Sequence, residues 1–176
     1  MSRDTERVEI RDAGFDDVRE IQRVARTTWD HTYYESTPES VRREFVSQAY
    51  STDSLRRRME SNAFLVAAEG EEILGFADFR PRSGTQAELA AIYVLPQMQG
   101  RGIGAHLLAA GIGRFSPLTR FVLRVEQDNT QAQRFYEAHG FRRIGEHAEE
   151  FYGHVVHEIE MSLHVPESAP WTISGK

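Results

Sequence analysis

The sequence predicts a single α/β domain in which helices cover a mixed β-sheet. Apolar runs of strand length alternate along the chain with segments whose apolar residues recur every three or four positions. Three of these runs follow one another through short turns, which predicts an antiparallel half of the sheet, and a later strand–helix–strand segment predicts two parallel neighbours. With 176 residues, 40% of them hydrophobic, the chain is long enough to bury one core. We expect one domain over residues 1–165 and a tail over residues 166–176.

The first third of the chain is predicted to be mostly helical. A short strand over residues 8–11 precedes a helix that begins near Phe15 and ends near Trp29. A second helix is expected to start at residues 37–39, because the order Thr-Pro-Glu is typical of a helix N-terminus capped by a hydroxyl. A third, short helix is expected from residues 52–53 onward.

The remaining elements surround one glycine-rich turn. Two apolar strands over residues 64–68 and 73–79 are joined by an acidic turn, and a third strand covers residues 89–95. The later elements are, in order, a helix after the glycine-rich turn, a strand over residues 121–125, a helix over 130–138 and a strand pair over 141–145 and 155–163. Because one helix connects the strands at 89–95 and 121–125, we expect these two strands to be parallel.

Composition narrows the class of protein. The chain has 21 basic and 27 acidic residues and a net charge of -6, which favours a cationic ligand over nucleic acid or an anionic membrane. The absence of cysteine excludes disulfides, thiolate metal sites and a cysteine nucleophile. No apolar run approaches a membrane span and no signal-peptide core is visible, so we expect a cytoplasmic protein. We predict no metal site at His147, His154 and His157, because residues three apart in a strand point to opposite faces.

The chain is organised around the glycine-rich turn at residues 99–104, read as Gln-Gly-Arg-Gly-Ile-Gly. Glycines at alternate positions keep side chains away from an approaching ligand and leave backbone N–H groups free at the start of a helix. The helix N-terminus and Arg101 add positive charge, so the turn predicts a phosphate or pyrophosphate ligand. The alternative is a tight connection that merely requires glycine.

Two other phosphate-binding motifs compete for this turn. A Walker loop fails, because no Gly-Lys-Ser/Thr follows and the only lysine is Lys176. A dinucleotide fingerprint fits better, since Gly100, Gly102 and Ala105 match G-x-G-x-x-A and Glu126 lies about twenty residues on, where a ribose contact is expected. Against it, residues 96–99 separate the strand from the first glycine, whereas a dinucleotide loop turns directly out of its strand.

Two sequence blocks resemble one family. Gln99, Gly102 and Gly104, read as Q-x-x-G-x-G, resemble the acetyl-CoA pyrophosphate loop of the GNAT superfamily of N-acetyltransferases. The block NTQAQRFYEAHGF at residues 129–141 is similar to the N-x-x-A-x-x-F-Y-x-x-x-G-F of the same superfamily, in the expected order and separation. The resemblance implies a GNAT fold, with about seven strands splayed between the fourth and fifth and about four flanking helices, and acetyl-CoA as cosubstrate.

The resemblance also implies roles for individual residues. Glu88 matches the general base, and a period of two places it on the face of Ile92 and Val94 unless a bulge intervenes. Tyr136 matches the tyrosine that donates a proton to the departing sulfur. Each residue also has a structural alternative. Glu88 could be a solvated acid at a strand end, and Tyr136 could be a half-buried helix tyrosine. Asn129, which would hydrogen-bond the cofactor, could instead be only a helix cap. The cofactor-binding residues implied are Ile92, Tyr93, Val94, Gln99, Gly100, Arg101, Gly102, Ile103, Gly104, Ala105, Asn129 and Phe135.

The segment at residues 29–37 suggests an acceptor. It mixes aromatic and acidic residues, which suits a cleft that binds an amine, although an aromatic cluster between helices would read the same. The substrate-binding residues predicted from it are Trp29, Tyr33, Tyr34 and Glu35. This region is similar to PaiA-type spermine/spermidine acetyltransferases, which implies that the acceptor is a primary amine, either a polyamine or another small amine. Without a cysteine nucleophile, the amine is expected to attack the thioester directly in a ternary complex. Ala90 and Ala91 depart from that type, which often has an acid and a polar residue there.

Two other functions remain open at this point. A protein N-terminal or lysine acetyltransferase would need an open groove for a peptide, and a sensor would bind acyl-CoA without turnover. The resemblance also implies a possible homodimer, formed through the C-terminal strands.

Overall fold

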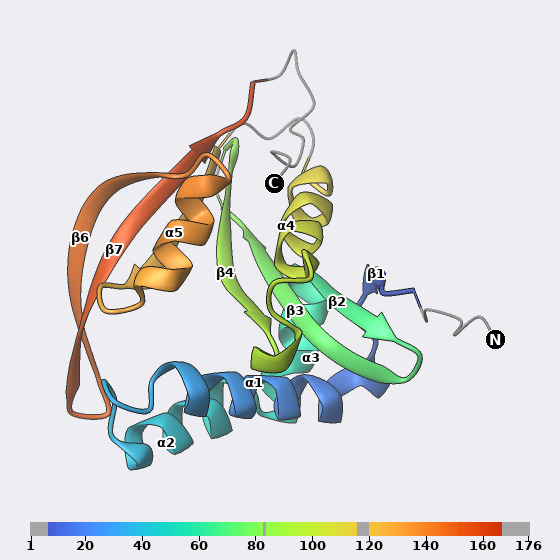
Figure 1. Ribbon diagram of the computed structural model, residues 1–176, viewed down its shortest axis with the longest axis horizontal. Coiled ribbons are helices and arrows are strands. Elements are labelled where there is room, and N and C mark those ends of the chain that lie inside the picture. The colour runs from blue at the N-terminus through green and yellow to red at the C-terminus, as the bar shows by residue number, and fades with distance from the viewer. Residues whose placement is uncertain (1–6, 83, 116–119, 167–176) are drawn as a thin grey trace.

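The computed structural model describes residues 7–82, 84–115 and 120–166, which form one seven-stranded mixed sheet with helices on both faces (Figure 1). The strands are β1 (Glu9–Asp12), β2 (Ala63–Glu69), β3 (Glu72–Pro81), β4 (Gln86–Val94), β5 (Arg120–Glu126), β6 (Arg142–Phe151) and β7 (His154–His164). The α-helices are α1 (Val18–Thr32), α2 (Glu39–Ala49), α3 (Thr52–Ser61), α4 (Ile103–Gly113) and α5 (Thr130–Ala138). The predicted α/β fold is confirmed, with five α-helices in the described residues where about four were expected.

The sheet is split at its centre. Its strand order is β1-β2-β3-β4-β5-β7-β6, and the β4–β5 pair is parallel whereas the other neighbours are antiparallel. The parallel ladder covers only residues 86–88 of β4 and 120–122 of β5. Beyond these residues the two strands diverge, which is the splay that the GNAT resemblance implies.

Each face of the sheet has its own hydrophobic core. Helices α4 and α5 cover one face, where Phe79, Leu107 and Phe121 are fully buried. Helices α1, α2 and α3 cover the other face, where Ile21 and Phe76 are fully buried. Burial of one such side chain contributes about 1.5–3 kcal/mol, so the two cores hold the half-sheets in place around the splay.

A bulge in β4 changes which residues share a face. Asp78 pairs with Ala91 and Phe79 pairs with Leu89, so Ala90 is an extra residue in β4. Leu89 packs in the α4 core, whereas Ala91 packs in the α1–α3 core. Glu88, next to Leu89, therefore lies on the face of Ala91 and not on that of Ile92 and Val94. Glu88 was predicted to share a face with Ile92 and Val94 unless a bulge intervened. The bulge at Ala90 does intervene, so Glu88 lies on the opposite face.

The helix boundaries differ slightly from those predicted. Helix α1 continues to Thr32, beyond the expected end near Trp29. Helix α2 begins at Glu39 with Pro38 as its N-cap, so Thr37 is not the cap. Thr37 is instead buried, and its carbonyl accepts a hydrogen bond of 2.5 Å from Arg42 Nη1. No helix in the described ranges is both long and apolar enough to cross a membrane. Of the predicted tail, residues 167–176 lie outside the described residues.

Candidate active site

The glycine-rich turn is shaped by three different requirements. Gly100 has a φ of 83° and Gly102 a φ of 80°, a left-handed conformation that other residues adopt at a cost. Gly104 is needed for space, because a Cβ there would lie 3.3 Å from the ring of Phe135. Gly102 is the N-cap of α4 and has no side chain to cap the helix. The first backbone N–H groups of α4 are therefore available to an anion.

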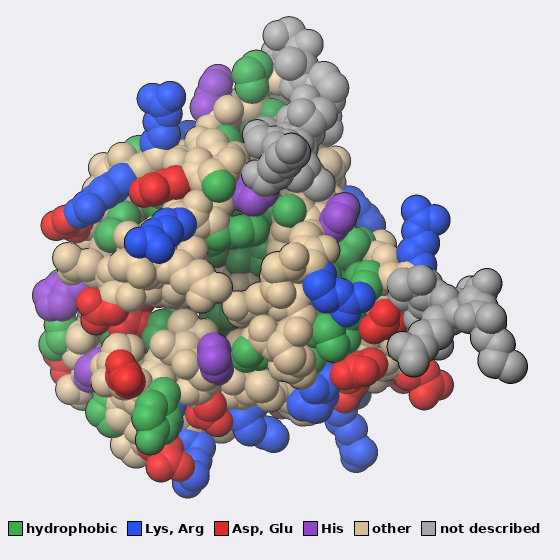
Figure 2. Space-filling view, viewed as in Figure 1, with side chains coloured by type: hydrophobic (Ala, Val, Ile, Leu, Met, Phe, Trp, Pro, Cys, Tyr) green, Lys and Arg blue, Asp and Glu red, His purple; other side chains and the backbone are tan. Residues whose placement is uncertain are grey.

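A hollow follows this turn on the surface. Figure 2 shows the face of the molecule hollowed between α4 and α5, with hydrophobic side chains on its floor over β4. The glycine-rich turn stands at the end of β4, so a long ligand with a phosphate group would extend from α4 along this strand. The arrangement suits a pantetheine arm, which is largely apolar and carries amide groups.

The peptide groups of β4 are the polar part of this floor. Leu95 N–H donates to Leu74 O on β3 at 2.9 Å, so alternation along the strand directs the peptide group of Tyr93 to β3 as well. Those of Ile92 and Val94 point the other way, where pairing with β5 has already ended. Two of the three predicted peptide donors thus open into the splay, whereas Tyr93 can contribute there only through its side chain.

Two polar side chains of the turn are partly engaged within the protein. Gln99 Nε2 donates to Val94 O at 3.2 Å, and its Oε1 accepts from Gln131 Nε2 at 3.0 Å. Arg101 lies 3.7 Å from Glu69, and its side chain is 43% exposed. The positive charge of Arg101 is thus only partly compensated and stays accessible to a phosphate.

Three tyrosines meet at the open end of the splay. Tyr136 of α5 is buried, and burial together with nearby Tyr93 raises its pKa well above the usual range. Burial also raises the pKa of Tyr93, whose hydroxyl accepts a hydrogen bond of 3.0 Å from Trp29 Nε1. Burial is likewise the main cause that raises the pKa of Tyr33, with Tyr93, Glu126 and Tyr136 close enough to contribute. All three phenols therefore stay protonated near neutral pH and can act as hydrogen-bond donors.

Asn129 connects the two walls of the site. Its Oδ1 accepts a hydrogen bond of 3.2 Å from Ala132 N–H, so it caps α5 as the structural alternative proposed. Its side chain is also close enough to Tyr33 to lower the pKa of that phenol, against the larger effect of burial. Asn129 thus lies near the α1–α2 connection and caps the helix that carries Tyr136.

Glu88, the predicted base, is held by arginines at the other end of β4. Its Oε2 accepts from Arg82 Nε at 2.9 Å and from a second nitrogen of the same guanidinium. Arg80 lies 3.8 Å from the same oxygen. Glu88 also pairs with Val122, so it belongs to the closed part of the β4–β5 ladder. The structure does not bring Glu88 together with the tyrosine group by any hydrogen bond.

The predicted acceptor residues have different environments. Trp29 is buried, stacks on Phe45 at 4.2 Å and contacts Tyr33 at 4.5 Å, so it packs α1 against α2 as the structural alternative proposed. Tyr34 is 73% exposed and Glu35 is also exposed. Of the four predicted residues, Tyr33 belongs to the tyrosine group and Trp29 donates a hydrogen bond to the Tyr93 hydroxyl of that group.

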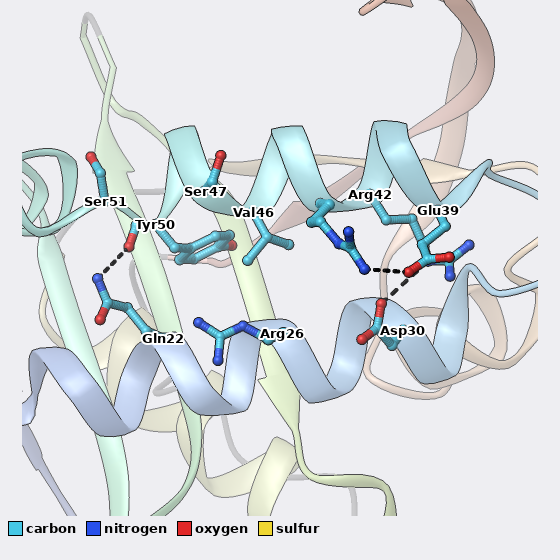
Figure 3. A pocket seen from close by; sticks show the side chains of 10 residues that line it. Gln22, Arg26, Asp30, Glu39, Arg42, Val46, Ser47, Tyr50 and Ser51 are labelled. Carbon is cyan, nitrogen blue, oxygen red and sulfur yellow. Dashed lines mark hydrogen bonds and ion pairs between the residues drawn. The ribbon is translucent and has the colours of Figure 1, made fainter.

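A buried arginine fixes the connection between α1 and α2. A cavity of about 370 Å³, lined mostly by polar residues, lies between these helices (Figure 3), and Arg42 on its wall is 5% exposed. Arg42 lies 3.3 Å from Asp30 and donates to the carbonyls of Thr37 and Tyr34. This cavity is separate from the glycine-rich turn. Its arginine holds the residues that present Tyr33 to the splay.

The predicted acceptor site did not include two carboxylates of the C-terminal half-sheet, although Glu126 had been considered as a ribose contact. Glu126 ends β5 and Glu158 is its partner in the β7 register. Burial raises the pKa of both, and for Glu158 the neighbouring carboxylate of Glu149 contributes to a value of about 7. A signal was available, because Phe121, Leu123 and Val125 form the buried face of β5 and leave Glu126 on the opposite face.

A splayed sheet, an anion-binding turn at the N-terminus of α4 and a phenol beside the opening define an acyl-CoA-dependent transferase. The sequence profile of the family described as "Acetyltransferase (GNAT) domain" matches residues 30–164. The chain therefore belongs to the GNAT family of acetyltransferases and uses acetyl-CoA as cosubstrate.

Three similar proteins illustrate the relationship. The chain is 29% identical over 159 residues to the uncharacterized N-acetyltransferase YuaI of Bacillus subtilis, which covers 86% of this chain and 90% of that protein. It is 28% identical over 143 residues to the spermidine N(1)-acetyltransferase of Thermoplasma acidophilum, covering 77% and 88% of the two chains. The crystal structure of PaiA N-acetyltransferase from Thermoplasma acidophilum in complex with coenzyme A has a similar fold, with a TM-score of 0.78, 23% identity and coverage of 90% and 99%.

Proposed function

We propose that the chain transfers the acetyl group of acetyl-CoA to a primary amine of a small molecule, with a polyamine as the favoured acceptor. The observation that carries this proposal is the splay, where the peptide groups of Ile92 and Val94 face the opening next to the glycine-rich turn. The thioester supplies an electrophilic carbonyl, and peptide N–H groups at such a place would stabilise the charge that develops on its oxygen.

The acceptor class is supported by two further observations. The similar spermidine N(1)-acetyltransferase acts, by its name, on a polyamine. The net charge of -6 favours approach of a cation, and the partly buried carboxylates of β5 and β7 lie on one side of the splay.

Tyr136 is the residue that we assign to proton donation toward the departing sulfur, because its hydroxyl stays protonated beside the splay. Glu88 is the general base that the GNAT resemblance suggests. To act as a base, Glu88 would have to be released from its hydrogen bonds with Arg82 or accept the amine proton through a water molecule. In the ternary complex the amine attacks the thioester directly, and proximity supplies much of the rate.

The two other functions make different demands. A protein N-terminal or lysine acetyltransferase would bind an extended peptide across the opening, whereas the packing of Trp29, Tyr33 and Phe45 closes the α1–α2 side. A sensor would bind acyl-CoA and show no turnover. Sedimentation of the purified protein would test the possible homodimer, and localisation of a tagged copy would test the expected cytoplasmic location.

The test is release of free coenzyme A from acetyl-CoA in the presence of spermidine, spermine, simpler amines and short peptides. The proposal predicts acceptor-dependent release with small amines that exceeds release with peptides. Release with peptides alone would favour the protein acetyltransferase, and binding of acetyl-CoA without release on any acceptor would favour the sensor.

A further inference from the structure

The last residue of β5 is a carboxylate that the GNAT motifs do not include. We propose that Glu126, and not Glu88, binds the ammonium group of the acceptor and removes its proton before attack. This inference rests on the proposed function and names the residue that recognises its substrate. In this role Glu126 contacts the acceptor amine, whereas in the dinucleotide motif considered from the sequence it would have contacted a ribose.

The position of Glu126 follows from the strand. Phe121, Leu123 and Val125 are buried in the core beneath α4 and α5, so the side chain of Glu126 lies on the opposite face, toward α1 and α2. Pairing between β4 and β5 ends at Val122, four residues earlier. Glu126 therefore stands where the splay is open and Glu88 stands where it is closed.

The neighbours of Glu126 are the other residues of the site. Ser36, from the α1–α2 connection, is close enough to lower the pKa of its carboxyl. Tyr33 is close enough for the charge of Glu126 to affect its ionisation, and Tyr93, Tyr136 and Asn129 also affect the pKa of this tyrosine. One phenol thus links the proposed base to the proposed acid.

Among the described residues, no cation is paired with Glu126. In the described part of the chain no arginine or histidine forms an ion pair with Glu126. Its register partner Glu158 has a fully buried oxygen, Oε1, without a hydrogen-bond partner there. The guanidinium of Arg124 acts on Glu158 but lies 3.9 Å from Glu149. Partly buried carboxylates without a counter-ion are costly, and an ammonium supplied by the substrate would offset this cost.

The protonation of Glu126 suits a base. Burial raises its pKa, the nearby charge of Asp128 raises it further, and the neighbouring Ser36 side chain lowers it. Ionisable and polar groups face this region from every packed element. They are Tyr33 and Ser36 of the α1–α2 connection, Tyr93 of β4, Tyr136 of α5, Asp128 after β5, and Glu158, Arg124 and Glu149 of the C-terminal half-sheet. A base whose pKa is nearer to neutral removes an ammonium proton more effectively.

The chemistry balances without another reactant. Glu126 takes one proton from the ammonium, and the amine lone pair then forms the C–N bond with the thioester carbon. The C–S bond breaks with its electron pair on sulfur, which takes a proton from Tyr136. The second nitrogen proton of the new amide restores that phenol, and Glu126 returns its proton to solvent. The products are the acetamide, the free thiol and one proton.

The experiment compares Glu126→Gln with Glu88→Gln and with Glu137→Gln, a matched change at an exposed acid of α5. We expect Glu126→Gln to lower kcat/KM for spermidine about 10²-fold or more and to abolish the acid limb of its pH profile. Calorimetry should show weaker binding of spermidine to the coenzyme A complex and unchanged affinity for acetyl-CoA. Glu137→Gln should match the wild type in all three measurements, and Asp128→Asn should keep activity and move the acid limb to lower pH.

Each outcome decides the assignment. A wild-type pH profile and wild-type spermidine affinity in Glu126→Gln would overturn it, and loss of the acid limb in Glu88→Gln alone would assign the base to Glu88. If the wild type releases no coenzyme A with any amine, the proposed function fails. Calorimetry then still tests ammonium binding, because equal spermidine affinity in wild type and Glu126→Gln would remove that part too.

Discussion

Arg58 of α3 and Asp78 of β3 form a buried ion pair, in which Arg58 Nε lies 2.8 Å from Asp78 Oδ2. Asp78 is fully buried, and its second oxygen accepts from Asn62 Nδ2 at 2.8 Å. The same guanidinium lies over the ring of Tyr50, 4.7 Å from its centroid. This pair therefore joins α3 to the residue that faces the β4 bulge.

Removal of the arginine should be strongly destabilising. We expect Arg58→Met to lower the free energy of unfolding by about 3–5 kcal/mol, because it leaves the Asp78 carboxylate buried without its cation. Urea denaturation would measure the loss. Arg57→Met, at an exposed neighbour on the same helix, should cost less than about 0.5 kcal/mol. Equal losses in the two variants would contradict the importance of the pair.

The glycine-rich turn predicts a loss of binding separate from a loss of stability. Gly102→Ala and Gly84→Ala both place a side chain at a left-handed φ, 80° and 71° respectively, so each should destabilise the fold by about 1–2 kcal/mol. Only Gly102→Ala should weaken the binding of acetyl-CoA, by about tenfold or more, because only Gly102 is the N-cap of α4 at the anion-binding end. Calorimetric titration with acetyl-CoA would separate the effects, and a similar loss of affinity in Gly84→Ala would remove the turn from the binding site.

Much of this architecture follows from local sequence pattern. The element order, the parallel β4–β5 pair and the glycine-rich turn were predictable because alternation, helical spacing and glycine act within a few residues. The bulge at Ala90 was not, because it depends on how β4 aligns with Asp78 and Phe79 of a different strand. The environment of Glu126 was hidden for the same reason, since Tyr33 and Ser36 come from the α1–α2 connection and Glu158 comes from β7, both far from Glu126 in the sequence.

Loss of the Tyr136 hydroxyl should slow the reaction without weakening the cosubstrate. We expect Tyr136→Phe to lower kcat about tenfold or more, because the departing sulfur loses its proton donor, while the ring keeps its place in the core. Steady-state rates with acetyl-CoA and direct binding of acetyl-CoA would be compared. An unchanged rate would mean that solvent or another group protonates the sulfur.

The stability of the fold should fall as Glu158 loses its proton. The pKa of Glu158 is raised from 4.5 to about 7, so the folded chain binds this proton more tightly than the unfolded chain does. Its contribution to folding is therefore full below about pH 4.5 and is lost as the pH rises to about 7. Glu158→Gln has no carboxyl to ionise there.

Unfolding of Glu158→Gln should accordingly become more costly relative to the wild type between about pH 4 and pH 8. Thermal denaturation across this range, with the exposed Glu150→Gln as the matched control, would show it. A constant difference between Glu158→Gln and wild type at every pH would contradict the raised pKa.

Transfer of the acetyl group to a small amine is the central claim, and one measurement tests it most directly. Purified wild-type protein is mixed with acetyl-CoA and spermidine, and mass spectrometry quantifies the acetylated amine beside free coenzyme A. The account predicts equal amounts of N-acetylated spermidine and coenzyme A, with no acetyl group left on the protein. Coenzyme A release without an acetylated amine, or an acetylated protein in place of the amine, would contradict it.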